Sequence, residues 1–174
     1  IAGSATIQKL QGTSLQVDKA VLEVFKQVGI KYTLSTDSVT VEKCLALKAF
    51  SFDATDCPDL FPVLAALAAN CKGISRIKGI HRLTHKESNR ALTIQTELGK
   101  LGIKIDLVGD EMVITGGPIN GGIASACNDH RIAMALGLCA LTAKGPVTIL
   151  GAQCVEKSYP AYFDDLKKLG VKME

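Results

Sequence analysis

Aromatic residues are scarce in this sequence: tryptophan is missing and aromatic side chains make up 5% of the 174 positions. Nucleic-acid binders combine basic clusters with rings on which bases stack, and a net charge of +3 adds little to that pattern. No apolar run approaches the roughly 18 residues of a membrane-spanning helix, and no secretory signal peptide opens the chain. The composition therefore predicts a cytoplasmic protein without a nucleic-acid or membrane partner.

Metal-ligand and nucleotide-binding motifs are also missing. The six cysteines include no Cys-x-x-Cys pair, and the three histidines form no cluster with them at ligand spacing. Most of the cysteines stand among apolar neighbours, which favours reduced core thiols over disulfides. No Gly-x-x-x-x-Gly-Lys-Ser/Thr loop is present to hold a nucleotide. We therefore expect no metal.

The overall balance of residues is that of a globular domain, with 47% hydrophobic and 21% charged residues. A chain of this length can bury roughly 70% of the surface that its unfolded form exposes. This length fits one domain or two small ones, and we predict a single domain over residues 1–174. The first residue is Ile1 rather than methionine, from which we expect the chain to be a piece of a longer one.

One local pattern occurs three times along the chain. A helical stripe over 15–28 ends at Gly29, and alternating apolar residues then predict a pair of strands up to Val41. The same signature recurs around Gly102 and, shortened, around Gly170. These glycines are 73 and 68 residues apart (102 − 29 and 170 − 102). The sequence therefore contains an internal repeat of about 70 residues.

The repeated unit has the order βαβαββ. It is complete over about 49–115, lacks its beginning at 4–43 and lacks its end at 121–174. Three such units can close around a pseudo-threefold axis and share one core. The helices predicted at 60–70 and 131–142 are apolar nearly all round, as buried central helices are. The predicted fold class is thus α/β (α+β), a pseudo-threefold domain of repeated units.

Charge is concentrated in residues 81–90, where six of ten side chains can carry it. Apolar residues recur at three-to-four spacing after Glu87, which predicts a helix of about four turns with Lys86, Glu87 and Arg90 in its first turn. Cations there oppose the helix dipole unless an anion binds between them and the free N–H groups. A solvated basic helix start is the alternative interpretation.

Polar residues occupy equivalent places in the repeated units. They are Asp59, the Lys86-Glu87…Arg90 cluster, Asp129-His130-Arg131 and Lys157. Taken singly, Asp59 and Asp129 are typical helix N-caps or first-turn acids, His130 is a typical packed or surface histidine, and Lys157 is a typical solvated lysine. Because each spot is predicted at the start of a helix, the helix N-termini should converge, and the joint placement favours an anion site on one concave face.

Three short motifs follow one another in the second half of the chain. They are Lys86-Glu87-Ser88-Asn89-Arg90, Asn128-Asp129-His130-Arg131-Ile132-Ala133-Met134 and Lys157-Ser158-Tyr159-Pro160. In order and spacing they resemble the C-terminal motifs of the EPSP synthase family, the 3-phosphoshikimate 1-carboxyvinyltransferases. Pro58-Asp59 and the alanine-rich helix after it extend the resemblance to about 45–174. A relative of the UDP-N-acetylglucosamine enolpyruvyl transferases, which share the fold but lack the first two motifs, and a stand-alone anion-binding module are the alternatives.

The resemblance implies transfer of the enolpyruvyl group of phosphoenolpyruvate to shikimate 3-phosphate, giving 5-enolpyruvylshikimate 3-phosphate and phosphate, with no cofactor. It implies catalytic roles for Asp59 as base, Glu87 as acid and Lys86 as a bridge between the substrates. The residues implied in binding phosphoenolpyruvate are Arg90, His130, Arg131 and Lys157. Those implied in binding shikimate 3-phosphate are Asp59, Lys86 and Arg82. Two positions depart from the family: Asn89 replaces a usual aspartate, and Arg82 replaces an uncharged polar residue.

The size of the family's enzymes carries a further implication. They are two-lobed and more than twice as long as this chain. The resemblance therefore implies that these residues form most of the C-terminal lobe, with the N-terminal lobe of the same polypeptide as partner. It also implies that this chain alone is inactive, because the phosphate group of shikimate 3-phosphate is bound mainly by the other lobe.

Overall fold

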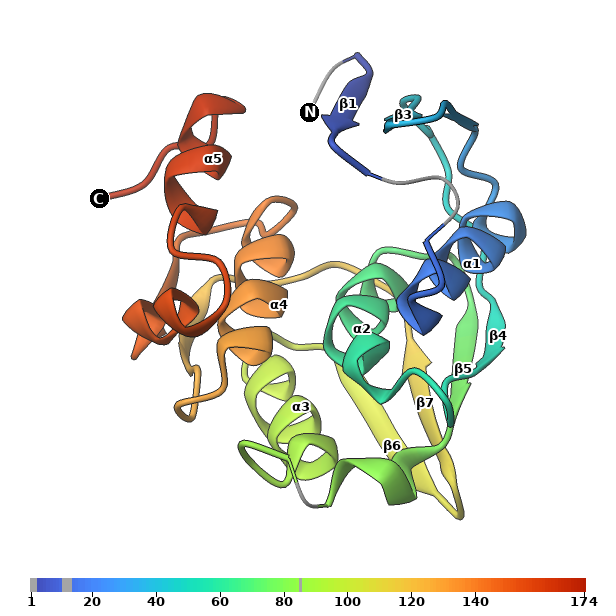
Figure 1. Ribbon diagram of the computed structural model, residues 1–174. Coiled ribbons are helices and arrows are strands. Elements are labelled where there is room, and N and C mark those ends of the chain that lie inside the picture. Colours follow the sequence, from blue (N-terminus) through green and yellow to red (C-terminus); the bar gives the residue numbers. More distant parts are fainter. Residues whose placement is uncertain (1–2, 11–13, 85) are drawn as a thin grey trace.

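The computed structural model describes residues 3–10, 14–84 and 86–174, and it contains three sheets linked by helices (Figure 1). The middle sheet belongs to a complete unit. In chain order its elements are β4 (Ser51–Asp53), the 3-10 helix η2 (Pro58–Leu60), α2 (Phe61–Ala69), β5 (Ile74–Lys78), the 3-10 helix η3 (Ile80–Leu83), α3 (Arg90–Gly99), β6 (Lys104–Val108) and β7 (Glu111–Thr115). The sheet order is β4-β5-β7-β6, with β4 and β5 parallel and the other neighbours antiparallel. This is the predicted βαβαββ order.

The two partial units contain the corresponding parts. The first has β1 (Ala5–Gln8), the 3-10 helix η1 (Val17–Ala20), α1 (Val21–Val28), β2 (Tyr32–Leu34) and β3 (Ser38–Val41). Its order β1-β3-β2 is antiparallel throughout, like β5-β7-β6. The third has β8 (Gly122–Ser125), α4 (His130–Ala140), β9 (Val147–Leu150), the 3-10 helix η4 (Ala152–Lys157) and α5 (Tyr162–Lys168). Its strands β8 and β9 are parallel, like β4 and β5.

Helices α2 and α4 form the centre of the molecule and lie next to each other (Figure 1). Phe61 and Leu64 of α2 and Ile132 and Leu136 of α4 are completely buried. Each such side chain stabilises the fold by about 1.5 to 3 kcal/mol through burial. The two predicted central helices are thus confirmed, with ends that differ by one or two residues. No helix in the described part of the chain is long and apolar enough to span a membrane.

Helix beginnings differ most from the sequence prediction. The sequence predicts a helix from Leu15, but helical structure starts only at Val17. Leu15 therefore lies outside the helix, and its side chain is 98% exposed. At the other end of α1 the prediction is confirmed: Gly29 closes the helix in the left-handed conformation at φ 88°. In α3 the helix begins at Arg90 and runs for 10 residues, shorter than the predicted four turns.

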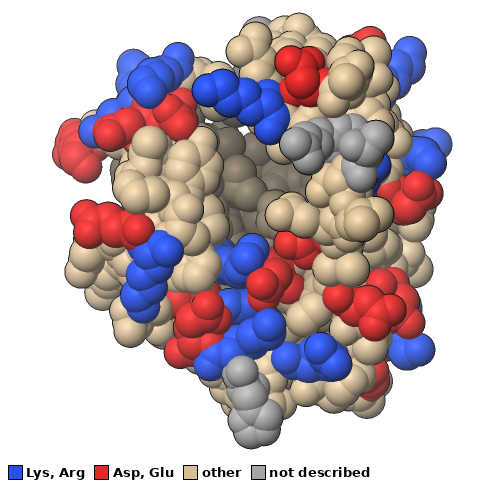
Figure 2. Space-filling view, in the orientation of Figure 1, with Lys and Arg blue, Asp and Glu red and all other residues tan. Residues whose placement is uncertain are grey.

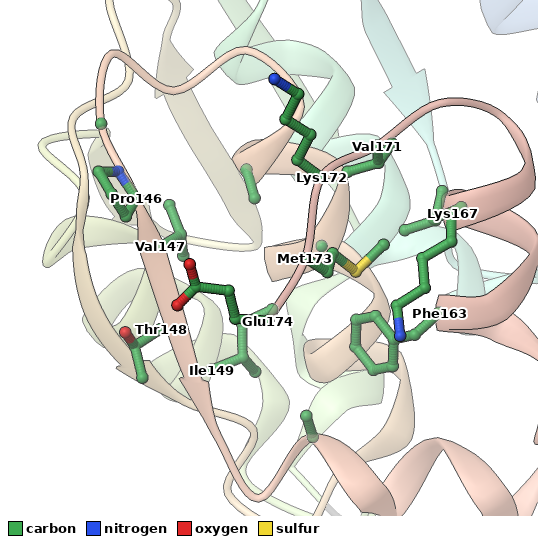
Figure 3. A pocket seen from close by; sticks show the side chains of 15 residues that line it. Pro146, Val147, Thr148, Ile149, Phe163, Lys167, Val171, Lys172, Met173 and Glu174 are labelled. Atoms are coloured by element: carbon green, nitrogen blue, oxygen red, sulfur yellow. The ribbon is translucent and has the colours of Figure 1, made fainter.

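Two cavities lie away from the predicted site residues. One of about 760 Å³ opens between α4, β9, α5 and the last residues of the chain, with Phe163, Ile149 and Met173 among its lining side chains (Figure 3). Another of about 360 Å³ lies between α1, α2 and α4. Apolar side chains dominate both linings. The larger cavity is also lined by Lys167, Lys172 and Glu174, whereas no charged residue in the described part of the chain lines the smaller one.

Candidate active site

The N-terminal ends of α2, α3 and α4 point to the same side of the molecule, the lower side in Figure 1. Asp59 lies in η2 directly before α2, Arg90 is the first residue of α3, and Asp129 is the N-cap of α4. Figure 2 shows acidic and basic side chains alternating across the lower middle of this face, below a hollow. The repeat thus brings the charges together, as the equivalence of the units predicts.

Arg90 is the centre of this charged cluster, and none of its side chain is exposed. Its Nε donates to Asp129 Oδ2 (2.9 Å) and its Nη1 to Asp59 Oδ1 (2.8 Å), while Nη2 donates to Glu87 and, at 3.3 Å, to Asp129 Oδ1. Burial by itself lowers the pKa of Arg90, but the bonds to Asp129 and Asp59 outweigh it and raise that pKa. One guanidinium therefore fixes three carboxylates from three different parts of the chain.

Asp59 accepts from three cations. Besides Arg90, the Lys86 Nζ lies 3.2 Å from Oδ1 and Arg131 Nη2 lies 3.0 Å from Oδ2. Partial burial alone raises the pKa of Asp59, but the Arg90 bond and the charges of Arg131 and Lys86 together lower it below the ordinary value. Asp59 is therefore ionised at neutral pH, and it lies where several positive groups meet.

Asp129 both caps α4 and holds Arg90. Its side chain accepts from the Arg131 backbone N–H (3.0 Å) and from Ser88 Oγ (3.2 Å), and it is completely buried. The capping expectation is thus confirmed for Asp129. Asp59 fits the other half of that expectation, since it lies in the first turn of η2, and its carboxylate is engaged by the three cations rather than by a helix N-terminus.

Lys86 and Glu87 lie before α3 rather than in its first turn. Asn89 is the N-cap, and its side chain accepts a hydrogen bond from the Leu92 N–H at 3.5 Å. The helix therefore begins at Arg90, the residue after Asn89. Arg82 lies on η3 with an exposed side chain, and among the described residues it forms no ion pair with the cluster. His85, part of the charged stretch, lies outside the described residues.

Lys157 approaches the cluster from a fourth element. It is the last residue of η4, not the start of a helix as predicted, and α5 begins only at Tyr162. Its Nζ donates to both the backbone oxygen and the side-chain Oδ1 of Asn128, each at 2.8 Å. Asn128 precedes Asp129, so the ammonium lies close to the start of α4. Sequence reasoning did not single out Asn128 as a partner.

His130 carries the one described buried side-chain polar atom without a hydrogen-bond partner, Nδ1. This atom lies 4.0 Å from Glu87 Oε1, too far for a hydrogen bond. Buried polar groups are normally paired. His130 Nδ1 therefore lies unpaired beside Glu87, the carboxylate for which the resemblance implies the acid role.

The cluster balances its own charge. Lys86, Arg90 and Arg131 supply three positive charges against those of Asp59, Glu87 and Asp129 (3 − 3 = 0). Lys86 and Arg131 are 27% and 31% exposed, so an incoming anion can reach them, whereas Arg90 is closed off. Carboxylates beside reachable cations suit proton transfer on an anionic substrate. Among the described residues, no three His, Cys, Asp or Glu side chains are placed to hold a metal.

Comparison with known proteins decides the family. The sequence model of the family EPSP synthase (3-phosphoshikimate 1-carboxyvinyltransferase) matches residues 1–166. The chain belongs to the EPSP synthase family. This agrees with the resemblance that the three motifs carry.

Relatives in the EPSP synthase family cover nearly all of the chain. A 3-phosphoshikimate 1-carboxyvinyltransferase of Aeropyrum pernix is 37% identical over 174 residues, 100% of this chain and 41% of the relative. One of Clostridium acetobutylicum is 40% identical over 169 residues, 97% of this chain and 39% of the relative. The chain therefore spans about two fifths of the length of these curated relatives.

Solved structures show the same fold. An EPSP synthase from Acinetobacter baumannii superposes with a TM-score of 0.82 at 24% identity, over 95% of this chain and 41% of that one. The enolpyruvyl transferase NikO from Streptomyces tendae gives 0.74 at 23% identity, over 97% of this chain and 39% of that one. The predicted enolpyruvyl transferase-like fold class is confirmed.

Proposed function

We propose that this chain supplies the phosphoenolpyruvate-binding half of the site in an enzyme that makes 5-enolpyruvylshikimate 3-phosphate. The observation that carries the proposal is the pair of carboxylates, Asp59 and Glu87, that Arg90 holds together beside two reachable cations. An enolpyruvyl transfer needs one base and one acid around a dianionic or trianionic substrate. This cluster offers both within one charged network.

In the proposed reaction Asp59 takes the proton of the shikimate 5-hydroxyl while that oxygen bonds to C2 of phosphoenolpyruvate. Glu87 gives a proton to the methylene carbon, and a tetrahedral intermediate forms. Glu87 then takes back a proton from the methyl group while the bond from C2 to the phosphate oxygen breaks, and Asp59 gives its proton to the departing phosphate. Lys86, paired with Asp59 at 3.2 Å, bridges the substrates, and His130 lies near the departing phosphate.

Recognition of phosphoenolpyruvate falls to Arg131 and Lys157, with Arg90 behind them. Arginine binds carboxylate and phosphate through two parallel bonds, and lysine binds them as a point charge. Because the Arg90 guanidinium is buried, a ligand reaches it only by displacing Glu87 or Asp59. Arg82 at the edge and an N-terminal lobe of the same polypeptide complete the hold on shikimate 3-phosphate. We place the enzyme in the cytoplasm, in keeping with its six unpaired thiols.

Replacing Arg131 or Lys157 by alanine in the full-length enzyme should lower kcat/KM about tenfold to a hundredfold. Each change removes a charge-assisted bond to the substrate, which contributes about 1.5 to 3 kcal/mol. Steady-state kinetics with phosphoenolpyruvate varied measures the loss. Lys104→Ala, an exposed lysine on β6, is the control. Wild-type kinetics in both site variants would remove these residues from the site.

The proposed function is tested by phosphate release from the full-length enzyme that carries this chain, given phosphoenolpyruvate and shikimate 3-phosphate. Release that requires both substrates supports the proposal. No release by a folded, phosphate-binding enzyme would leave only an anion-binding module. The 174-residue chain alone, assayed in parallel, should give no turnover, because positioning and water exclusion need both lobes. Turnover by the single chain would refute the division of labour between lobes.

A further inference from the structure

Helix α3 holds the loop before α4 at both ends of that loop. Arg90 and Glu97 are seven residues apart (97 − 90), about two helical turns, so both side chains lie on one face of α3. Arg90 binds Asp129 at the end of the loop, and Glu97 Oε2 accepts from the Ser125 backbone N–H at its beginning (2.7 Å). Residues 126–128 are therefore held between two anchored ends.

Glu97 is a buried carboxylate that the proposed chemistry does not use. The residue is 5% exposed, and its other contacts are Lys100 Nζ, 2.8 Å from both oxygens, and Cys127 Sγ at 3.9 Å. A buried charge is unfavourable unless its partners satisfy it. The partners here belong to α3's own end and to the loop, so the carboxylate fixes the loop to the helix.

The loop itself turns sharply. Cys127 and Asn128 have successive left-handed φ values of 49° and 58°. Asparagine tolerates that region better than most residues. In this conformation the backbone oxygen and Oδ1 of Asn128 both accept from Lys157 Nζ at 2.8 Å. A lysine ammonium has three donors, so the third, which takes no acceptor among the described residues, can bind an anion.

From this geometry we propose that Asn128 and Glu97 are positioning residues for Lys157, Asn128 by direct contact and Glu97 by anchoring the loop that carries it. The proposal rests on the proposed function, in which Lys157 contacts phosphoenolpyruvate. Lys157 is exposed and has no carboxylate within ion-pair distance in the described part of the chain. Without Asn128 its flexible stem would sample many positions, so each substrate encounter would have to order it.

The direct contact is tested with Asn128→Gly in the full-length enzyme. Glycine keeps the left-handed conformation and removes one of the two acceptors. The KM for phosphoenolpyruvate should rise about threefold to tenfold with kcat within about twofold, since one charge-assisted bond of two is lost. In a Lys157→Ala background the same change should have no further effect. An equal rise in both backgrounds, or no rise at all, would overturn the proposal.

The anchoring role is tested with Glu97→Leu, Glu97→Gln and Lys100→Ala. The glutamine oxygen still accepts from the Ser125 N–H, so Glu97→Gln should keep most of the wild-type KM while Glu97→Leu raises it. Lys100→Ala leaves the carboxylate on Ser125 and should leave the KM unchanged. If Glu97→Leu does not fold, the comparison of Lys100→Ala with Glu97→Gln tests the anchoring role instead. A raised KM in Lys100→Ala together with a wild-type KM in Glu97→Gln contradicts that role.

Binding of inorganic phosphate separates this inference from the proposed function. Affinity for phosphate is measured on the same full-length variants by isothermal titration, without any turnover. Asn128→Gly should weaken binding about threefold, and only when Lys157 is present. If the wild type transfers no enolpyruvyl group but this pattern holds, the proposed function fails and the positioning role stands. If transfer occurs and phosphate binding ignores Asn128, the positioning role fails.

Discussion

Replacing Arg90 by methionine should lower the free energy of unfolding by about 3 to 5 kcal/mol, the cost of leaving a buried charge without its partner. Asp129 is completely buried and takes both its charge-assisted bonds from Arg90. Methionine fills much of the volume of arginine but donates no hydrogen bond to Asp129. Urea denaturation of the chain followed by circular dichroism measures the loss. A change below about 1 kcal/mol would show that the cluster contributes little to the fold.

A double-mutant cycle identifies the cause of that loss. Asp129→Asn keeps the acceptor for the Arg131 N–H but removes the charge, so adding it to Arg90→Met should restore part of the stability. The matched control is Lys26→Met on α1, whose ion pair with Glu23 has both side chains about 60% exposed. That change should stay within about 0.5 kcal/mol of the wild type. If the stability losses of Arg90→Met and Asp129→Asn simply add in the double variant, the two side chains are not coupled.

The repeat made the architecture predictable because each unit leaves a local record. Gly29 and Gly102 mark helix ends where a left-handed residue is needed, and both have positive φ. Strand alternation and the all-round apolar character of α2 and α4 also depend on neighbours along the chain. These local patterns were enough to order the elements and to find the central helices.

The hydrogen bonds and ion pairs of the site join residues far apart in the sequence, so the sequence does not show them. Arg90 and Asp129 are 39 positions apart, and nothing local indicates that the guanidinium is buried. The start of α3 was missed because Asn89 caps it, whereas the apolar spacing after Glu87 predicted an earlier beginning. Asparagine and aspartate cap helices about equally well. The departure from the usual aspartate at Asn89 therefore leaves the helix start intact.

Asp59→Asn should have opposite effects on anion binding and on transfer. The Asp59 carboxylate accepts from Arg90, Lys86 and Arg131, so it occupies the place that an anionic ligand would take among these cations. At about 6 Å and an effective dielectric constant of about 40, two like charges repel by about 1.4 kcal/mol, equivalent to a tenfold change in affinity. The variant should therefore bind inorganic phosphate roughly tenfold more tightly.

Transfer should fall in the same variant by about a hundredfold to ten-thousandfold, the usual contribution of a general base. Isothermal titration with phosphate and a phosphate-release assay on the full-length enzyme measure the two effects. Asp106→Asn on β6, an exposed aspartate outside the cluster, should change neither. Tighter phosphate binding with unchanged transfer would show that Asp59 only balances charge and that the base lies elsewhere.

Acid denaturation gives Asp59→Asn a second readout. Because the pKa of Asp59 is lowered on folding, its ionised form stabilises the fold above the ordinary value of 3.8, and this contribution disappears as the pH falls through the lower folded-state pKa. Asparagine cannot titrate, so the variant should be less stable than the wild type at pH 7, and the difference should shrink below about pH 4. A difference that stays constant from pH 7 to pH 2 would mean that asparagine perturbs packing rather than charge, and the gain in phosphate affinity would then need another cause.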